Sequence, residues 1–189
     1  MVFLDAPGMA GRPEAVTYDC TAAVRDLAAL LAERGHRTVA YLDAATRSAT
    51  FRQRRELLGE ALAARGLRLL GDEVRAELDV DSARSAAARH LARWRGEGAT
   101  AVVGAADTLA YGVLSAAREA RVRVPEDLGV AGFDDLPSSA ITAPALTSIS
   151  LPGAVMGRVA AERLLAALEG RGTPDVGPLG ARLVRRESL

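Results

Sequence analysis

The stretch "VAGFDDLPSS", residues 130–139, is a short apolar run that ends abruptly at two adjacent acids. Val130 to Phe133 have the composition of a buried strand, and Asp134 and Asp135 follow at once. A turn-like Leu-Pro-Ser-Ser segment comes next. Burying a charged carboxylate is costly unless it has partners. The rest of the fold should therefore explain why this strand ends on two of them.

Short strand-like runs alternate with helical patterns along the chain. Gly and Pro residues mark the ends of several of these segments. Repeated strand–helix–strand order predicts an α/β fold, with a parallel sheet and helices on both of its faces. We expect strands at residues 2–4, 15–18, 38–42, 67–70, 100–103, 128–133 and 182–185, and helices at residues 20–34, 50–65, 82–95, 107–120 and 152–169.

Acidic residues recur where the expected strands end. In open parallel sheets, ligands bind in the crevice outside the carboxyl ends of the strands. A carboxylate in such a crevice needs hydrogen-bond donors, and sugar hydroxyls supply them. An Arg side chain in the same crevice would itself donate hydrogen bonds to acceptor oxygens of the ligand. The pattern suits a polyhydroxylated ligand, but Asp residues at such places more often cap the helix or turn that follows them. The acids concerned are Asp5, Asp43, Asp107 and Asp134.

The overall charge excludes some partners. The 189 residues contain 24 basic and 24 acidic side chains, and every basic residue is Arg. This balance gives no general attraction to nucleic acid or to an anionic membrane. The N-terminus has no secretory signal pattern, and no stretch approaches 18 apolar residues, so we expect no membrane span.

The same composition argues against catalysis and against cofactors. A single cysteine, Cys20, fits a reducing cytoplasm and rules out an internal disulfide framework. With only two His residues a zinc site is not expected. Gly132 is not part of a dinucleotide-binding Gly pattern, and Ser138 and Ser139 lack a nucleophile elbow and a partner His. We therefore expect no enzyme activity, no metal and no cofactor.

Several longer stretches carry a family resemblance. The segments are "LAALLAERGHRTVAYL", "RRELLGEALAARGL", "RVPEDLGVAGFDDLPSS", "PALTSISLPGAVMGRVAAERLLAALEG" and the terminal "LVRRESL". In this order and at these spacings, the sequence resembles the sensor domain of the LacI/GalR family of transcription regulators. The resemblance covers nearly the whole chain.

The resemblance implies a periplasmic-binding-protein-like fold. In that fold two Rossmann-like subdomains are joined by three crossing strands, and an effector binds in the cleft between them. Residues 18–147 and 176–189 would form the C-terminal, effector-binding subdomain. Residues 1–17 and 148–175 would form part of the N-terminal subdomain, the rest of which would precede this sequence.

The resemblance also implies a set of functional residues. Asp134, Arg54, Asp5 and Asp107 match positions that contact the effector in this family, whereas Asp135 is expected to serve the loop or a helix cap. Tyr111 and Ile141 fall where the family buries a subunit interface, which implies a homodimer.

Three departures from the family pattern concern the pocket, at Ala106 and Leu151, and the local helix packing, at Leu57-Leu58. Ala106 stands where the family usually has Asn, and Leu57-Leu58 stand where it has Gly followed by an aromatic residue. Leu151 stands where a polar cleft residue is common. We therefore expect a more apolar pocket than that of a typical sugar site, which would also suit a nucleoside or a substituted sugar.

These observations predict a cytoplasmic effector sensor of a LacI-type regulator. Its partner would be a small molecule, a sugar or a nucleoside. DNA would be contacted only through a helix-turn-helix, and these residues contain no such pattern. The sequence would then be a fragment of a longer repressor, a product of a wrongly assigned start, or a truncated gene product.

Two alternatives stay open at this point. A solute-binding protein of a sugar transporter would have the same fold, but it would need a secretory signal. A non-functional remnant is the other, because an incomplete subdomain leaves sheet edges unpaired and apolar faces uncovered.

Overall fold

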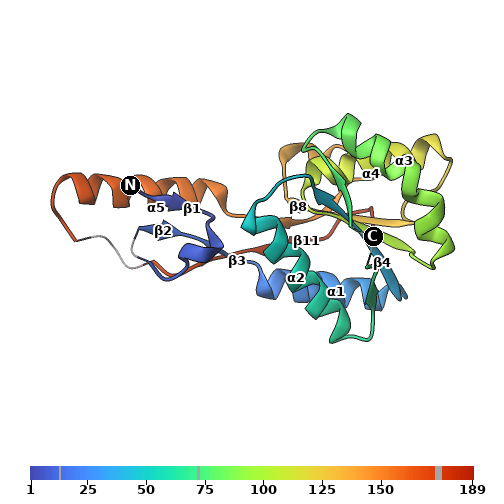
Figure 1. Cartoon of the computed structure of the whole chain (residues 1–189), viewed down its shortest axis with the longest axis horizontal. Helices are drawn as coiled ribbons and strands as arrows, with labels where there is room; N and C mark the ends of the chain where they lie inside the picture. The colour runs from blue at the N-terminus through green and yellow to red at the C-terminus, as the bar shows by residue number, and fades with distance from the viewer. Residues whose placement is uncertain (13, 72, 173–175) are drawn as a thin grey trace.

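Buried apolar runs build a central sheet in the larger of two lobes (Figure 1). The computed structural model describes residues 1–12, 14–71, 73–172 and 176–189, and within these the large sheet has seven strands. Their order is β11-β9-β8-β7-β4-β5, and β6 also pairs with β4. The pairs are parallel except for β11 against β9. The strands are β4 (Thr38–Ala44), β5 (Arg68–Leu69), β6 (Val74–Ala76), β7 (Ala101–Gly104), β8 (Gly129–Asp134), β9 (Thr147–Ser150) and β11 (Arg182–Val184).

Four helices cover the two faces of this sheet, as the alternating pattern predicts. Helices α1 (Thr21–Glu33) and α2 (Ala49–Ala63) pack together on one face, and α3 (Val80–Gly96) and α4 (Asp107–Glu119) on the other (Figure 1). Every residue of β4 is buried, as expected for a strand with helices on both sides. The prediction of an α/β fold with a largely parallel sheet is confirmed.

The smaller lobe is built from both ends of the chain. It contains β1 (Phe3–Leu4), β2 (Ala15–Val16) and α5 (Gly153–Leu168), with a 3-10 turn at Pro7–Met9. Its own apolar cluster centres on Val16, Met156 and Val159. The buried Arg163 side chain ties α5 to the lobe, because its guanidinium donates to the carbonyl oxygens of Ala15 and Val176.

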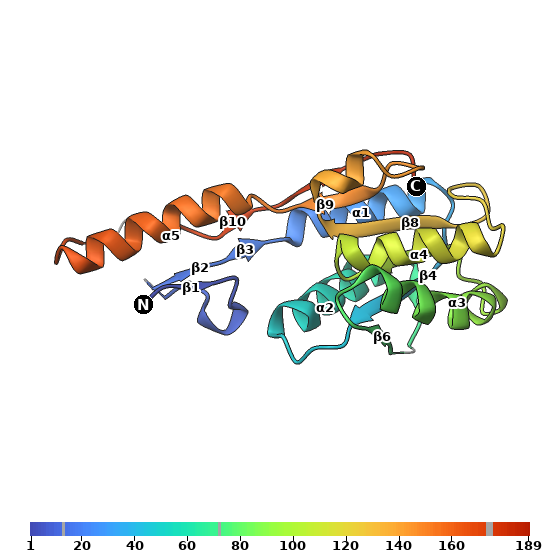
Figure 2. The same cartoon turned by 90° about the horizontal axis from the view of Figure 1, so that it is seen from above.

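Three segments of the chain pass between the lobes. One follows β3 (Tyr18–Asp19) into α1, the second joins β9 to α5, and the third runs from β10 (Leu179–Gly180) into β11. Strands β3 and β10 pair in parallel, so two of the crossing segments lie side by side (Figure 2). The expected subdomain boundary at residue 175 lies outside the described residues.

The structure corrects three local predictions. The strand expected at 15–18 is two strands, β2 and β3, which pair with different partners. Strand β9 was not predicted, because its Thr and Ser residues do not form an apolar run. Asp107 was expected to cap a helix, but Ala106 occupies the N-cap position of α4 and provides no side-chain acceptor.

Candidate functional site

An ion pair marks the carboxyl end of β8. Nη1 of Arg54 lies 3.0 Å from Oδ1 of Asp134. The same nitrogen donates to the carbonyl oxygen of Ala105, which follows β7, at 2.9 Å. Arg54 is only 6% exposed, so its charge is held inside the protein beside two strand ends. The acid at the end of the opening sequence stretch therefore faces a buried guanidinium.

Local structure fixes the position of that guanidinium. Ser48 caps α2 by accepting from the backbone N–H of Thr50, so the helix starts at a defined residue. Phe51 and Arg54 are three residues apart and share one face of α2. The Arg54 guanidinium lies 5.4 Å from the ring centre of Phe51 and 5.0 Å from that of Phe133. Two aromatic rings and an ion pair thus hold the Arg54 side chain.

Asp5 reaches the same place from the smaller lobe. It follows β1, and its carbonyl oxygen accepts a hydrogen bond from Oγ1 of Thr50 at 2.9 Å. Asp5, Thr50 and Arg54 line a cavity of about 60 Å³ at the junction of the lobes. The sequence predictions for Asp5, Arg54 and Asp134 therefore fall on side chains that the structure brings together. The other lining residues are Tyr18, Asp19, Cys20, Thr21, Gln53 and Leu57.

Burial dominates the electrostatics of this junction. It raises the pKa of Asp134 to about 6, although the nearby Arg54 charge acts in the opposite direction. Burial also raises the pKa of Asp5, again opposed by Arg54. The pKa of the Cys20 thiol is raised to about 11, mainly by burial. The site thus contains carboxylates that are poorly solvated and would gain from additional hydrogen-bond donors.

The backbone at the junction is strained. Among the described residues, four non-glycine residues have positive φ, and three of them are Asp5 (44°), Asp134 (106°) and Asp135 (54°). This conformation costs an L-residue about 1–2 kcal/mol. Such strain concentrates at functional sites, because the surrounding structure has to compensate for it.

A family comparison agrees with the fold. A family model described as a periplasmic binding protein-like domain matches residues 28–189. Solved structures that the chain resembles are described as regulators of the LacI family. The chain belongs to the LacI family. Its relatives in that family are transcriptional regulators and not enzymes.

Individual LacI-family relatives extend beyond the region that this chain covers. The transcriptional regulator AscG of Escherichia coli is 32% identical over 159 residues, which are 84% of this chain and 47% of that protein. A sugar-binding regulator from Escherichia coli, solved with phosphate, superposes with a TM-score of 0.86 at 28% identity, over 100% of this chain and 67% of that one.

Another LacI-family structure that the chain resembles was solved with a bound sugar, lactose. The Arthrobacter regulator complexed with lactose gives a TM-score of 0.80 at 30% identity, over 99% of this chain and 70% of that one.

The chain spans about half the length of the curated regulator AscG. Among the described residues, no helix is both long and apolar enough to cross a membrane.

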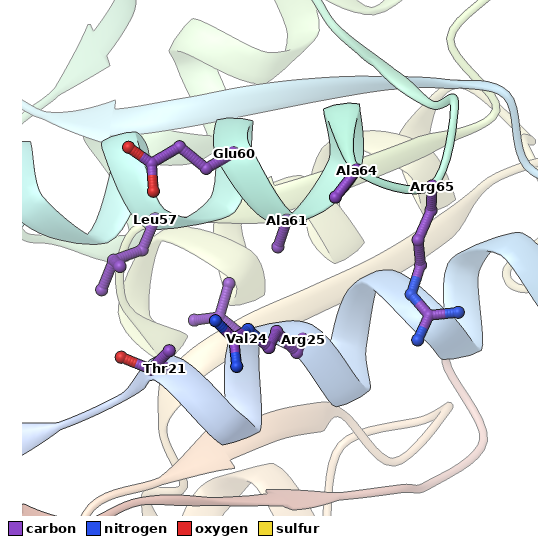
Figure 3. Close-up of a pocket in the computed structure, with 8 residues that line it drawn as sticks. All are labelled: Thr21, Val24, Arg25, Leu57, Glu60, Ala61, Ala64 and Arg65. Carbon is purple, nitrogen blue, oxygen red and sulfur yellow. The ribbon is translucent and has the colours of Figure 1, made fainter.

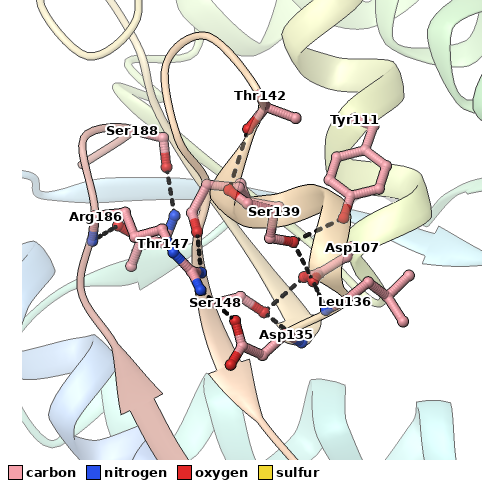
Figure 4. A network of polar contacts seen from close by, with 11 residues as sticks. Asp107, Tyr111, Asp135, Leu136, Ser139, Thr142, Thr147, Ser148, Arg186 and Ser188 are labelled. Carbon is pink, nitrogen blue, oxygen red and sulfur yellow. Dashed lines mark hydrogen bonds and ion pairs between the residues drawn. The ribbon is translucent and has the colours of Figure 1, made fainter.

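Asp107 does not have the geometry expected of a LacI-family ligand contact. Its side chain is fully buried and lies in the polar network of Figure 4. Both carboxylate oxygens accept from the protein: Oδ1 from Ser148 Oγ at 2.6 Å, and Oδ2 from Ser139 Oγ at 2.5 Å and the Leu136 backbone N–H at 2.8 Å. Because protein donors already occupy these oxygens, we assign Asp107 to holding β9 and the loop after β8 in place.

Gly132 makes room for the Asp107 carboxylate. A Cβ atom at Gly132 would lie 2.3 Å from Oδ1 of Asp107. Asp135, in the loop after β8, pairs with Arg186 at 2.6 Å and so ties that loop to the segment after β11. This agrees with the expectation that Asp135 serves the loop.

The two expected interface residues lie near one another on the α4 side of the molecule. Tyr111 is half-buried, and its hydroxyl forms a hydrogen bond of 2.7 Å with Ser139 Oγ. Ile141 is 84% exposed. Tyr111 also lines a hollow of about 230 Å³ together with Leu114, Ser115, Arg118, Thr142 and Ala143. Tyr111 therefore packs within the monomer and also contributes to a surface.

A larger hollow of about 460 Å³ lies between α1 and α2 (Figure 3). None of the predicted ligand residues lines it. It shares Thr21 and Leu57 with the small cavity, so the two adjoin. The lining residues are Thr21, Val24, Arg25, Leu57, Glu60, Ala61, Ala64 and Arg65.

Sequence reasoning missed several residues of the cavity. Tyr18 and Cys20 flank a crossing segment whose position depends on pairing with the distant β10. Thr50 and Gln53 lie within one turn of Arg54 on α2, and this helical spacing was a usable signal. Among the described residues, no three His, Cys, Asp or Glu side chains gather as a metal site would require.

Proposed function

We propose that this chain is the effector-sensing part of a LacI-type regulator that works in the cytoplasm. The effector is a hydroxylated small molecule bound between the lobes by Asp134, Arg54 and Asp5. The proposal rests mainly on the ion pair between buried Arg54 and partly exposed Asp134, 3.0 Å long, beside an acid from the other lobe. The lactose complex of the Arthrobacter relative supports a sugar as the ligand class.

The geometry supports a mechanism based on closure of the lobes. Arg54 and Asp134 belong to the larger lobe, whereas Asp5 belongs to the smaller one. A ligand that contacts all three would bind more tightly when the lobes are close, and it would shift the population toward that arrangement. In a full-length regulator such a shift would change DNA affinity through a separate DNA-binding part.

We also propose that the chain forms a homodimer through the surface around Tyr111 and Ile141. The exposed Ile141 side chain and the adjoining hollow support this assignment. The division into subdomains at residues 18–147 with 176–189, and 1–17 with 148–175, is part of the same proposal. The two separate apolar clusters support two subdomains, but they shift these bounds, because Ile149 of β9 lies in the cluster of the larger lobe and Val176 and Leu179 pack against the cluster of the smaller one.

The test of the sensor function is a thermal melt of the chain against sugars and nucleosides, repeated with Asp134→Ala. We expect one ligand class to raise the melting temperature of the wild-type chain. Asp134→Ala should weaken that ligand by roughly 10- to 150-fold, because each lost hydrogen bond to a charged group is worth about 1.5–3 kcal/mol.

Asp26→Ala is the matched control. Asp26 is an exposed acid on α1, away from the cavity, and its substitution should leave ligand affinity unchanged. Equal affinities of Asp134→Ala and wild type in calorimetry would remove Asp134 from the site. A cooperative melt that no member of the panel shifts would count against a sugar or nucleoside sensor.

A further inference from the structure

The charges around the cavity carry information about the ligand beyond its hydroxyl groups. Asp5, Asp19 and Arg54 line the cavity, and Asp134 is ion-paired with Arg54. These four side chains carry three negative charges and one positive charge. Among the described residues that line the cavity, Arg54 is the one cation. Arg25, which lines the adjoining hollow, acts on Asp19, so the excess of negative charge at the junction rests on Asp5 and Asp134 against Arg54.

Arg54 is poorly placed to attract an additional anion. Its charge is already compensated by Asp134 at 3.0 Å, and Asp5 also interacts with it electrostatically. Two aromatic rings restrict the guanidinium, so it cannot swing away from Asp134 without losing both contacts. A ligand carboxylate or phosphate would therefore meet Asp5 and Asp134 without an uncompensated cation to offset the repulsion.

We propose that the effector is a hydroxylated amine, of the amino-sugar class, and not a sugar acid or a sugar phosphate. This inference rests on the proposed function and narrows its ligand class. A protonated amine has three N–H donors and no acceptor, which matches a site with an excess of carboxylates. Its hydroxyl groups can be bound by the same carboxylates and by the Tyr18, Thr50 and Gln53 side chains that line the cavity.

The cost of burying the carboxylates supports the same conclusion. Burial makes the ionised forms of Asp5 and Asp134 less favourable, even with Arg54 close by. An ammonium group between them would offset part of that cost, because an opposite charge stabilises the ionised form. A neutral sugar would offset less of it, and an anion would add to it.

The experiment compares three compounds on one skeleton: galactose, galactosamine and galacturonate, with the glucose series run in parallel. Affinity for the 189-residue chain is measured by calorimetry at pH 7. We expect the amine to bind at least about tenfold more tightly than the neutral sugar, and the acid at least about tenfold more weakly. An acid that binds as tightly as the neutral sugar, or an amine that gains nothing over it, would overturn the inference.

This design separates the inference from the function on which it rests. Binding of the neutral or acidic compounds with no advantage for the amine leaves the sensor function in place and removes only the charge argument. Absence of binding by every compound, from a chain that melts cooperatively, counts against both.

Two variants test the stated cause. Asp5→Asn keeps the shape of the side chain and removes one charge, so the ratio of amine affinity to neutral-sugar affinity should fall toward one. Asp26→Asn, on the exposed face of α1, should leave that ratio unchanged. If Asp5→Asn does not fold, Asp19→Asn at the exposed rim of the cavity should lower the ratio in the same direction. An unchanged ratio in a folded variant contradicts the assignment.

Discussion

Asp134 holds its negative charge at a cost in stability. Its pKa in the folded protein is about 6, above the ordinary value of 3.8, because burial outweighs the attraction of Arg54. Its φ of 106° is an additional strain, which Asn tolerates better than most residues. Both effects make the functional residue a weak point of the folded structure, as is common where binding and stability compete.

We therefore expect Asp134→Asn to be more stable relative to wild type at pH 7 than at low pH, while it impairs ligand binding, because Asn carries no charge that has to be buried. Between pH 4 and pH 6 the folded state binds the Asp134 proton more tightly than the unfolded state does. Wild-type stability contributed by this group thus falls as the pH rises through that window. Below the unfolded-state pKa of 3.8, Asp134 becomes protonated in both the folded and the unfolded chain, and the relative gain of Asn should vanish. Denaturant unfolding at pH 7 and at pH 4 measures the difference.

Asp127→Asn is the control, because we expect it to have the opposite effect on the pH dependence of stability. The Arg123 side chain donates two hydrogen bonds to the Asp127 carboxylate and holds its pKa below the ordinary value. Removal of that charge should lower stability at pH 7, and the loss should diminish as the pH falls. A stabilising effect of both substitutions would show that the two carboxylates do not differ as described.

At the level of single residues, the sequence predicted where a residue lies in the fold better than where its side chain points. Strand ends predicted where Asp134 and Asp5 lie, whereas Arg54 was assigned through the family resemblance. The inward direction of Asp107 could not be predicted. It depends on Ser139 and Ser148, which are 32 and 41 residues away in the sequence.

At the level of elements, α3 and α4 approach each other closely because small residues line their contact. A Cβ atom at Gly112 of α4 would lie 2.4 Å from Cβ of Ala83 on α3. The absence of a side chain at Gly112 is therefore a packing requirement and not a need for an unusual φ. In α2, by contrast, a Cβ atom at Gly59 would meet only Cδ2 of Leu69, at an ordinary 3.6 Å.

The two helix glycines should respond oppositely to the same substitution. We expect Gly112→Ala to destabilise the fold by about 1–3 kcal/mol, since the α3–α4 contact would have to open. Gly59→Ala should stabilise it by about 0.5–1 kcal/mol, because Ala restricts the unfolded chain and favours a helix. Urea unfolding of the two variants provides the comparison. A stabilised Gly112→Ala variant would mean that the helices are farther apart than described.

Helices were easier to predict than strands for a physical reason. The helices have apolar residues at regular spacings that local sequence reveals. Strand β9 instead buries polar residues, and its stability comes from distant partners such as Ser188, whose hydroxyl accepts from the backbone N–H of Thr147. Strands β3 and β10 are two residues each and exist only because they pair with each other.

At the level of the whole molecule, the proposed dimer surface can be tested at Ile141. Tyr111 is a poor choice for substitution, because loss of its hydroxyl would disturb the Ser139–Asp107 network. Ile141→Asp should leave that network intact. We expect sedimentation to show a dimer for wild type and a monomer for Ile141→Asp, since a buried carboxylate without a partner is costly.

Leu168→Asp is the matched control on the other lobe. Leu168 is 76% exposed near the end of α5, so the same change is made at a comparably exposed apolar residue. It should leave the oligomeric state unchanged. If Leu168→Asp dissociates the dimer and Ile141→Asp does not, the interface lies on α5 and not beside α4.

The place of Cys20 gives the chain a natural attachment point for a chemical probe. It is the only cysteine in the sequence, and it lines the cavity where the chain passes from one lobe to the other. A fluorophore coupled there would sit at a single position without any engineered mutation. The raised thiol pKa slows alkylation of Cys20. The rate of that reaction would also report whether the cavity is occupied, because a bound compound would slow it further.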